Sequence, residues 1–170
     1  DAALFYGERA GEMSTIIADL NLDAKEYVLA TCHRAENTDE PERLGGIFKA
    51  LATIASDRPV VMPLHPRTKK YADKYGLNSY MECLRVIEPI SFFDMVALEK
   101  EAFSIITDSG GVQKEAFFYG VPCLTLRDET EWVETVKDGG NKLVSASSSK
   151  IVEAFGNIES MRGIGSKSNI

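Results

Sequence analysis

Short apolar segments alternate with longer segments of helical period along almost the whole chain. The apolar segments predict strands at residues 27–31, 59–64, 84–88, 103–108, 122–126 and 142–145. The intervening pattern predicts helices near residues 40–56, 67–75, 91–101, 111–119, 131–138 and 148–160, and an earlier one at Met13–Leu20. Strands that are apolar on both faces and joined by helices belong to parallel sheets covered on both sides. The sequence therefore predicts one doubly wound α/β domain, residues 1–170, with about six strands.

The size and charge of the chain narrow the class of protein. With 170 residues, 44% hydrophobic and 26% charged, its composition is ordinary for a globular domain with one core. The formal net charge of −7 argues against a nucleic acid or an anionic membrane as partner, since both need a basic face. No apolar run approaches the ~20 residues that span a bilayer, and no signal peptide is recognised.

The cysteines and histidines carry no recognisable metal or redox motif. Cys32, Cys83 and Cys123 are far apart without C-x-x-C spacing, so free thiols in a reducing, cytoplasmic compartment are expected. His33 and His65 show no metal-ligand spacing, and no G-x-G-x-x-G follows the first predicted strand. We therefore expect no cofactor. Because the chain begins without methionine and ends abruptly, we also expect an excised domain.

Polar segments follow the predicted strands one after another. They are "CHRAEN", "HPR", "PISFFD", "DSGGVQKE" and "RDETEW", after the first to the fifth strand in turn. In doubly wound sheets, ligands bind outside the carboxyl ends of the strands. These segments should therefore meet at one rim of the sheet, which predicts a binding site there.

The "DSGGVQKE" segment combines two groups that suit a nucleotide. Ser109, Gly110 and Gly111 precede a predicted helix, whose first N–H groups and dipole attract a phosphate or pyrophosphate. Glu115 follows about one turn later, and its carboxylate would repel phosphate but accept hydrogen bonds from ribose hydroxyls. The structural alternative is a serine N-cap, a tight glycine turn and a solvent-facing glutamate.

Other candidates also have structural alternatives. His33 could be a hydrogen-bonded structural histidine at a strand end. Arg127 and Asp128 could form an ordinary loop ion pair, which contributes little to stability. Phe92 and Phe93 are compatible with core packing or with the wall of a base pocket. The residues alone leave these alternatives open.

The order of the motifs resembles one family. "TCHRAENTD", "PLHPRTKK", "EPISFFDMVAL" and "TDSGGVQKEAFFYGVPCLTLRDETEW" follow one another as in the C-terminal half of the UDP-N-acetylglucosamine 2-epimerase family, in its non-hydrolysing branch. The resemblance runs from about Tyr27 to the end, where "GIGSKSNI" is similar to a family segment. It implies a GT-B architecture of two Rossmann-like domains, with the UDP-sugar between this domain and its own N-terminal domain.

The resemblance also implies a reaction. A cytoplasmic isomerase of cell-envelope polysaccharide biosynthesis would interconvert UDP-N-acetylglucosamine and UDP-N-acetylmannosamine. UDP would leave C1 and add again, with inversion at C2 and no metal or redox cofactor. The carboxylates that move the C2 proton lie mainly in the family's N-terminal half. We therefore expect the chain alone to be inactive, and the full-length enzyme to be a homodimer.

Individual residues match functional positions of the family. Those that would bind UDP are Ile90, Phe92, Ser109, Gly110, Gly111, Glu115, Arg127 and Glu131. Among them, the backbone around Ile90–Phe92 would contact the uracil. His33 matches the catalytic histidine near the leaving diphosphate, where an imidazole stabilises departing charge. Arg34 and His65 match the domain interface, which contacts a second, activating UDP-sugar in regulated members. Val133 departs from the usual proline, so the shape of that loop is in question.

Other functions share these motifs. Epimerases of UDP-2,3-diacetamido sugars carry similar "RAENTD" and "HPRTKK" segments. A GT-B glycosyltransferase uses the same glycine-rich turn and ribose glutamate. These two features would also be sufficient for a nucleotide-binding module without catalytic activity. The histidine motif favours the epimerase, because a transferase has less need of "HRAEN" after the first strand.

Overall fold

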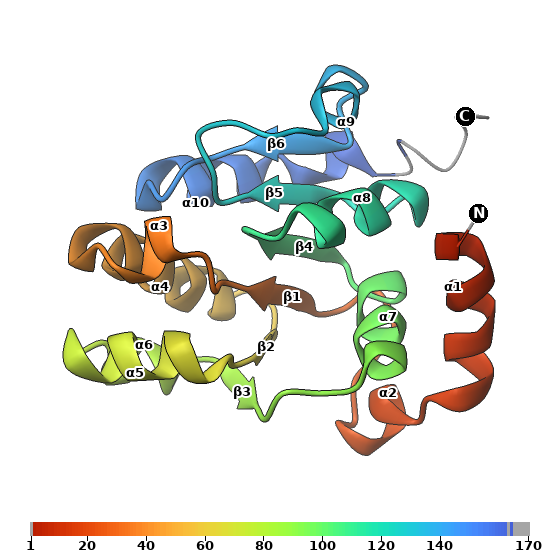
Figure 1. Ribbon diagram of the computed structural model, residues 1–170, viewed down its shortest axis with the longest axis horizontal. Coiled ribbons are helices and arrows are strands. Elements are labelled where there is room, and N and C mark those ends of the chain that lie inside the picture. Colours follow the sequence, from red (N-terminus) through yellow and green to blue (C-terminus); the bar gives the residue numbers. More distant parts are fainter. Residues whose placement is uncertain (1, 163, 165–170) are drawn as a thin grey trace.

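The computed structural model describes residues 2–162 and 164, and a six-stranded parallel sheet forms its centre (Figure 1). The strands are β1 (Val28–Thr31), β2 (Val60–Pro63), β3 (Arg85–Ile87), β4 (Ser104–Thr107), β5 (Cys123–Thr125) and β6 (Asn141–Leu143). Their order is β3-β2-β1-β4-β5-β6, and every neighbouring pair is parallel. The predicted doubly wound, Rossmann-like fold is confirmed. The "GIGSKSNI" segment, for which a similarity to the family was predicted, lies outside the described residues except for Ile164.

Helices cover both faces of the sheet (Figure 1). One face packs against α4 (Pro41–Ala55), α5 (Pro66–Lys74), α6 (Asn78–Met81), α10 (Ser148–Gly156) and the 3-10 helix η1 (Ile158–Met161). The other packs against α2 (Ile16–Asp19), α7 (Phe92–Lys100) and α8 (Gly110–Phe118). Successive strand residues point to opposite faces of the sheet. Val28 and Ala30 therefore pack in the hydrophobic cluster on the first face, and Leu29 packs in the cluster on the second. Within the described residues, no helix is long and apolar enough to cross a membrane.

The N-terminal helix differs from the prediction. Instead of one helix at Met13–Leu20, the chain forms α1 (Ala2–Met13) and then the short α2. Ser14 lies between them, and its hydroxyl donates to Asp94 of α7 at 2.6 Å and accepts from the N–H of Ile16 at 3.2 Å. Helix α1 packs on α7, outside the layer that covers the sheet (Figure 1). Because it buries small residues such as Ala10 there, it lacks the large apolar stripe that predicts a helix.

Two further helices are short and were not predicted separately. They are α3 (Ala35–Thr38), which lies within the polar segment after β1, and α6. Helix α9 (Val133–Lys137) is shorter than predicted, and the helix predicted at 148–160 divides into α10 and η1. Segments of one turn have no amphipathic repeat, so the sequence pattern does not reveal them.

The strand order places the site. The chain continues from β1 to β2 on one side and from β4 to β5 on the other, so the segments that follow β1 and β4 diverge. Such a reversal leaves a crevice at the carboxyl edge of a parallel sheet. Thr31 and Thr107 end the two strands as direct partners, and their hydroxyl groups hydrogen-bond at 2.6 Å. The two polar motifs after these strands therefore lie side by side.

Candidate functional site

A buried carboxylate, Asp108, holds the segment after β1 against the end of β4. Asp108 is 0% exposed and accepts hydrogen bonds from the backbone N–H groups of His33 (3.1 Å) and Arg34 (3.0 Å) and from the amide of Asn37 (3.0 Å). Nδ1 of His33 lies 3.6 Å from the same carboxylate. Bonds to an ionised acceptor are the stronger kind. The "DSGG" motif contains Asp108, but the sequence analysis assigned it no role.

Asn37 ties this network to β5. It is fully buried, and its amide also donates to the carbonyl of Leu126 at 3.1 Å. Its side-chain oxygen accepts from Nε of Arg43 at 3.1 Å. The segments after β1, β4 and β5 are thereby joined into one unit. Asn37 is a second residue of this network that the sequence analysis did not single out, since an asparagine in a polar motif suggests a surface position.

The two histidines stack next to each other. The ring centroids of His33 and His65 are 5.8 Å apart, with 30° between the planes. His65 is the N-cap of α5, and its Nδ1 accepts from the N–H of Arg67 at 3.1 Å. In this arrangement Nδ1 carries no proton, which leaves Nε2 as the donor of the neutral ring. The structure thus brings together a predicted catalytic residue and a predicted interface residue.

A cavity of about 250 Å³ lies where the segments after β1 and β4 diverge. It is lined by Thr31, Cys32, His33, Pro63, His65, Pro89, Ile90, Met95, Ser109 and Val112. Ile90, Met95 and Val112 supply an apolar wall, and His33 and Ser109 supply polar groups. A cavity with an apolar wall and a few polar groups suits a small ligand that carries both a ring and hydrogen-bonding groups.

Helix α8 begins at this cavity. Ser109 is its N-cap, with Oγ accepting from the N–H of Val112 at 3.3 Å. Its own N–H donates to Thr107 Oγ1 at 3.0 Å. The first N–H groups of a helix have no partner within it, and the dipole adds partial positive charge there. Because Gly110 and Gly111 carry no side chains that could cover these groups, the geometry supports the predicted anion site.

The segment after β5 folds over this helix end. Glu131 Oε1 lies so close to Gly110 that a Cβ atom there would overlap it. Glu131 also binds Arg127 at 2.8 Å, and a backbone hydrogen bond and then Arg127 lower the pKa of its carboxyl. The alternative of an Arg127–Asp128 pair is wrong, because Asp128 lies 3.5 Å from Arg43 instead. A carboxylate therefore lies beside the predicted diphosphate position.

Glu115 does not face solvent freely. It is half-buried on α8, and its carboxyl group is in hydrogen-bond contact with that of Glu99 on α7. Glu99 is 1% exposed. Burial, and then the contact with Glu115, raise the pKa of Glu99 to about 10. Glu99 is a third residue that the sequence analysis missed, since a glutamate followed by Lys100 and Glu101 suggests a surface.

Of the predicted residues, only His33, His65, Ile90 and Ser109 line the cavity, and Arg34 and Phe92 are among those that do not. The Arg34 side chain is 41% exposed and lies 3.4 Å from Glu36. Phe92 is 53% exposed and packs edge-on against Tyr6 of α1, with ring centroids 5.3 Å apart, so it is not a core residue. The predicted roles of Arg34 at a domain interface and of Phe92 beside the uracil stay predictions.

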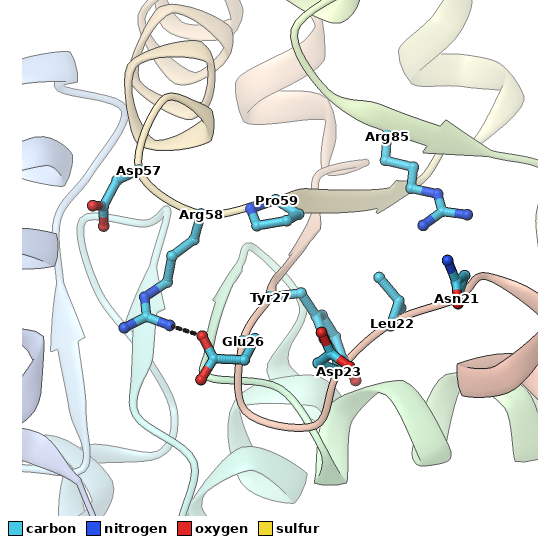
Figure 2. A pocket seen from close by; sticks show the side chains of 9 residues that line it. All are labelled: Asn21, Leu22, Asp23, Glu26, Tyr27, Asp57, Arg58, Pro59 and Arg85. Atoms are coloured by element: carbon cyan, nitrogen blue, oxygen red, sulfur yellow. Dashed lines mark hydrogen bonds and ion pairs between the residues drawn. The ribbon is translucent and has the colours of Figure 1, made fainter.

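A larger hollow, of about 550 Å³, lies at the opposite edge of the sheet (Figure 2). It is lined by Asn21, Leu22, Asp23, Glu26, Tyr27, Asp57, Arg58, Pro59 and Arg85, which precede β1 and β2 or begin β3. Arg58 and Glu26 form an ion pair there at 3.0 Å (Figure 2). Since doubly wound sheets bind ligands at their carboxyl edge, the smaller cavity is the candidate site.

Sequence similarity over almost the whole chain identifies its family. A family model described as UDP-N-acetylglucosamine 2-epimerase matches residues 1–169. The chain belongs to this family. Among the relatives of this epimerase-family chain, a UDP-N-acetylglucosamine 2-epimerase homolog of Methanococcus maripaludis is 50% identical over 141 residues, 81% of this chain and 39% of that protein.

Two other relatives extend the comparison. A UDP-2,3-diacetamido-2,3-dideoxy-D-glucuronate 2-epimerase of Pseudomonas aeruginosa is 46% identical over 156 residues, 91% of this chain and 42% of that protein. The Methanocaldococcus jannaschii UDP-GlcNAc 2-epimerase, solved in complex with UDP-GlcNAc and UDP, has a TM-score of 0.83 and 38% identity. That match covers 92% of this chain and 45% of the solved one. The epimerase-family chain thus spans less than half the length of each of these relatives.

Proposed function

We propose that this chain is the nucleotide-binding domain of a UDP-sugar 2-epimerase. The observation that carries the proposal is the convergence of His33, the Asp108 network and the start of α8 at one cavity. Membership of the epimerase family supports it, as does the M. jannaschii structure with bound UDP. In the proposed enzyme, the protein's own N-terminal domain completes a GT-B cleft across the carboxyl edge of the sheet.

Each part of UDP has a proposed position. The diphosphate binds the N–H groups of Gly110 and Gly111 and the hydroxyl group of Ser109, whose own N–H already donates to Thr107. The uracil lies along the apolar wall near Ile90, and the ribose hydroxyls donate to Glu115. Because Glu131 lies on Gly110, it must turn away when the diphosphate binds. Arg127 then exchanges the Glu131 carboxylate for the diphosphate, which keeps its guanidinium paired.

His33 acts in the proposed reaction when UDP leaves C1 of the sugar. Negative charge grows on the diphosphate at this step, and a nearby imidazole N–H stabilises it. Asp108 lies 3.6 Å from Nδ1 and accepts from the backbone N–H of His33, which holds the residue at the cavity. Among the residues that the structure describes, those lining the cavity include no carboxylate that could move the C2 proton. We therefore propose that this group comes from the N-terminal domain and that the chain alone binds UDP without turnover.

The sugar and the assembly belong to the same proposal. UDP-N-acetylglucosamine is the first candidate, and a UDP-2,3-diacetamido sugar is the second, because the P. aeruginosa relative is 46% identical to this chain. We also propose that a second UDP-sugar binds at Arg34 and His65. The full-length protein is proposed to be a homodimer in the cytoplasm.

Calorimetry with UDP and UMP tests the binding proposal. UDP should bind more tightly than UMP, because the second phosphate adds charge-assisted bonds to the helix N–H groups. Equal or tighter binding of UMP would overturn the diphosphate assignment. For the activity, the full-length protein is incubated with each candidate UDP-sugar and no acceptor. An epimerase equilibrates its substrate under these conditions, whereas a glycosyltransferase leaves the sugar unchanged or slowly hydrolyses it.

A further inference from the structure

A buried carboxyl group lies behind the proposed ribose ligand. Glu99 comes from α7, which packs against α8, and its side chain meets that of Glu115 between the two helices. It is 1% exposed, and within the described residues its Oε2 has no hydrogen-bond partner. Burying a carboxyl group is unfavourable, and an apolar side chain would fill the same space without that penalty. Glu99 neither lines the cavity nor belongs to the anion site at the start of α8, so neither feature explains why a carboxyl group is buried here.

The surroundings decide which of the two carboxyl groups keeps a proton. Two carboxylates in contact cannot both stay ionised, so the pair retains one proton. Within the described residues, the titratable groups acting on Glu99 are Glu115, Tyr119 and Cys123, and none of them is a cation. Burial raises the pKa of Tyr119 and of Cys123 to about 12, so both are neutral. Glu99 is the more deeply buried of the two, and burial raises its pKa, so Glu99 keeps the proton of the pair.

We propose that Glu99 is a positioning residue for the ribose of the nucleotide. Its carboxylic acid donates a hydrogen bond to one oxygen of Glu115 and holds that side chain in one rotamer. The other oxygen is then ready to accept from the ribose hydroxyls, with less side-chain freedom to lose on binding. This role rests on the proposed binding of UDP. It adds specificity, since a site arranged to bond a hydroxyl discriminates against a ligand that lacks it.

The experiment compares UDP with 2′-deoxy-UDP by calorimetry at neutral pH. Glu99→Gln keeps a donor of the same shape and should bind UDP within about twofold of wild type. Glu99→Met fills the space without a donor and should weaken UDP binding on the order of five- to tenfold, the loss of about one hydrogen bond. The affinity for 2′-deoxy-UDP should change much less, so the preference for ribose should shrink. Glu82→Met is the matched control, because Glu82 is exposed at the end of α6, which packs on the other face of the sheet from α7.

A pH series adds a readout that needs only the glutamine variant. As the pH rises toward about 10, the wild-type Glu99 ionises and repels Glu115. The UDP affinity of wild type should therefore fall relative to that of Glu99→Gln. Ionisation of the uracil affects both proteins alike and cancels in the ratio. A ratio that stays constant through the alkaline range would overturn the proposal.

The outcomes separate this inference from the function on which it rests. Equal weakening of UDP and 2′-deoxy-UDP binding by Glu99→Met would mean that Glu99 supports the fold and not the ribose ligand. If Glu115→Ala weakens UDP binding but Glu99→Met does not, the UDP site stands and the positioning role is overturned. If the wild-type protein does not bind UDP, the proposed function fails and this inference fails with it.

Discussion

Replacing Asp108 by asparagine should release the segment that carries His33. The carboxylate accepts from three donors, the N–H groups of His33 and Arg34 and the amide of Asn37. Asparagine keeps the shape but weakens these bonds, and its own NH₂ group faces at least one donor. Hydrogen bonds to a charged group contribute about 1.5–3 kcal/mol each, and an unsatisfied buried donor costs about 1–3 kcal/mol. After allowance for the unfavourable burial of the charge, we expect a loss of about 3 kcal/mol in the free energy of unfolding.

Urea denaturation followed by circular dichroism measures this loss. Asp57→Asn is the control, because Asp57 is exposed at the opposite edge of the sheet and its change should stay within about 0.5 kcal/mol. Asp108→Asn should also weaken UDP binding, since His33 and α8 lose their common anchor. A loss below about 1 kcal/mol, no more than an ordinary hydrogen bond, would refute the anchoring role.

Three further outcomes are expected. The stability that Glu99 contributes is complete below its ordinary pKa of 4.5 and declines as the pH rises, because only the folded protein keeps the proton. Relative to wild type, Glu99→Gln should therefore gain about 1.4 kcal/mol in the free energy of unfolding per pH unit between about pH 5 and about pH 7. Urea denaturation at several pH values measures this difference. If the difference between the two proteins does not change with pH, Glu99 is not a buried protonated acid. In Gly110→Ala, the new methyl group should displace the end of the Glu131 side chain. The melting temperature should change little, but calorimetry should show clearly weaker UDP binding. Unchanged affinity would exclude Gly110 from the anion site. In the full-length protein, His33→Asn should lower turnover by ~10² or more with a smaller effect on UDP affinity, and near-normal turnover would make His33 a structural residue.

The fold was predictable where the relevant interactions are local. Strands β1 and β4 are buried at every residue, so they stand out as short apolar runs. The cap of α8 could also be read, because Ser109 bonds Val112 three residues later. Helix α1 was missed because its main contacts are with the helices α7 and α8. The strand order follows from long-range pairing, which no single segment encodes.

The missing parts of the site have the same cause. The partners of Asp108 lie 71 to 75 residues away in the sequence, so nothing near Asp108 reveals that it anchors them. Glu99 is buried only because α7 packs against α8, and its sequence neighbours are charged. The family resemblance named the positions that we expect to face the ligand, such as Ser109. It did not name the residues behind them, whose partners depend on packing.

The pairing of β1 with β4 also has a consequence for how the protein folds. Thr31 and Thr107, whose hydroxyl groups meet beneath the cavity, are 76 residues apart in the chain. A loop of that length must close before the two strands can pair, and such long-range contacts slow folding. The crevice therefore exists only after β4 has taken its place between β1 and β5. A nucleotide that binds this crevice has nothing to bind in a chain whose sheet is incomplete, so it draws the population toward the finished state by mass action.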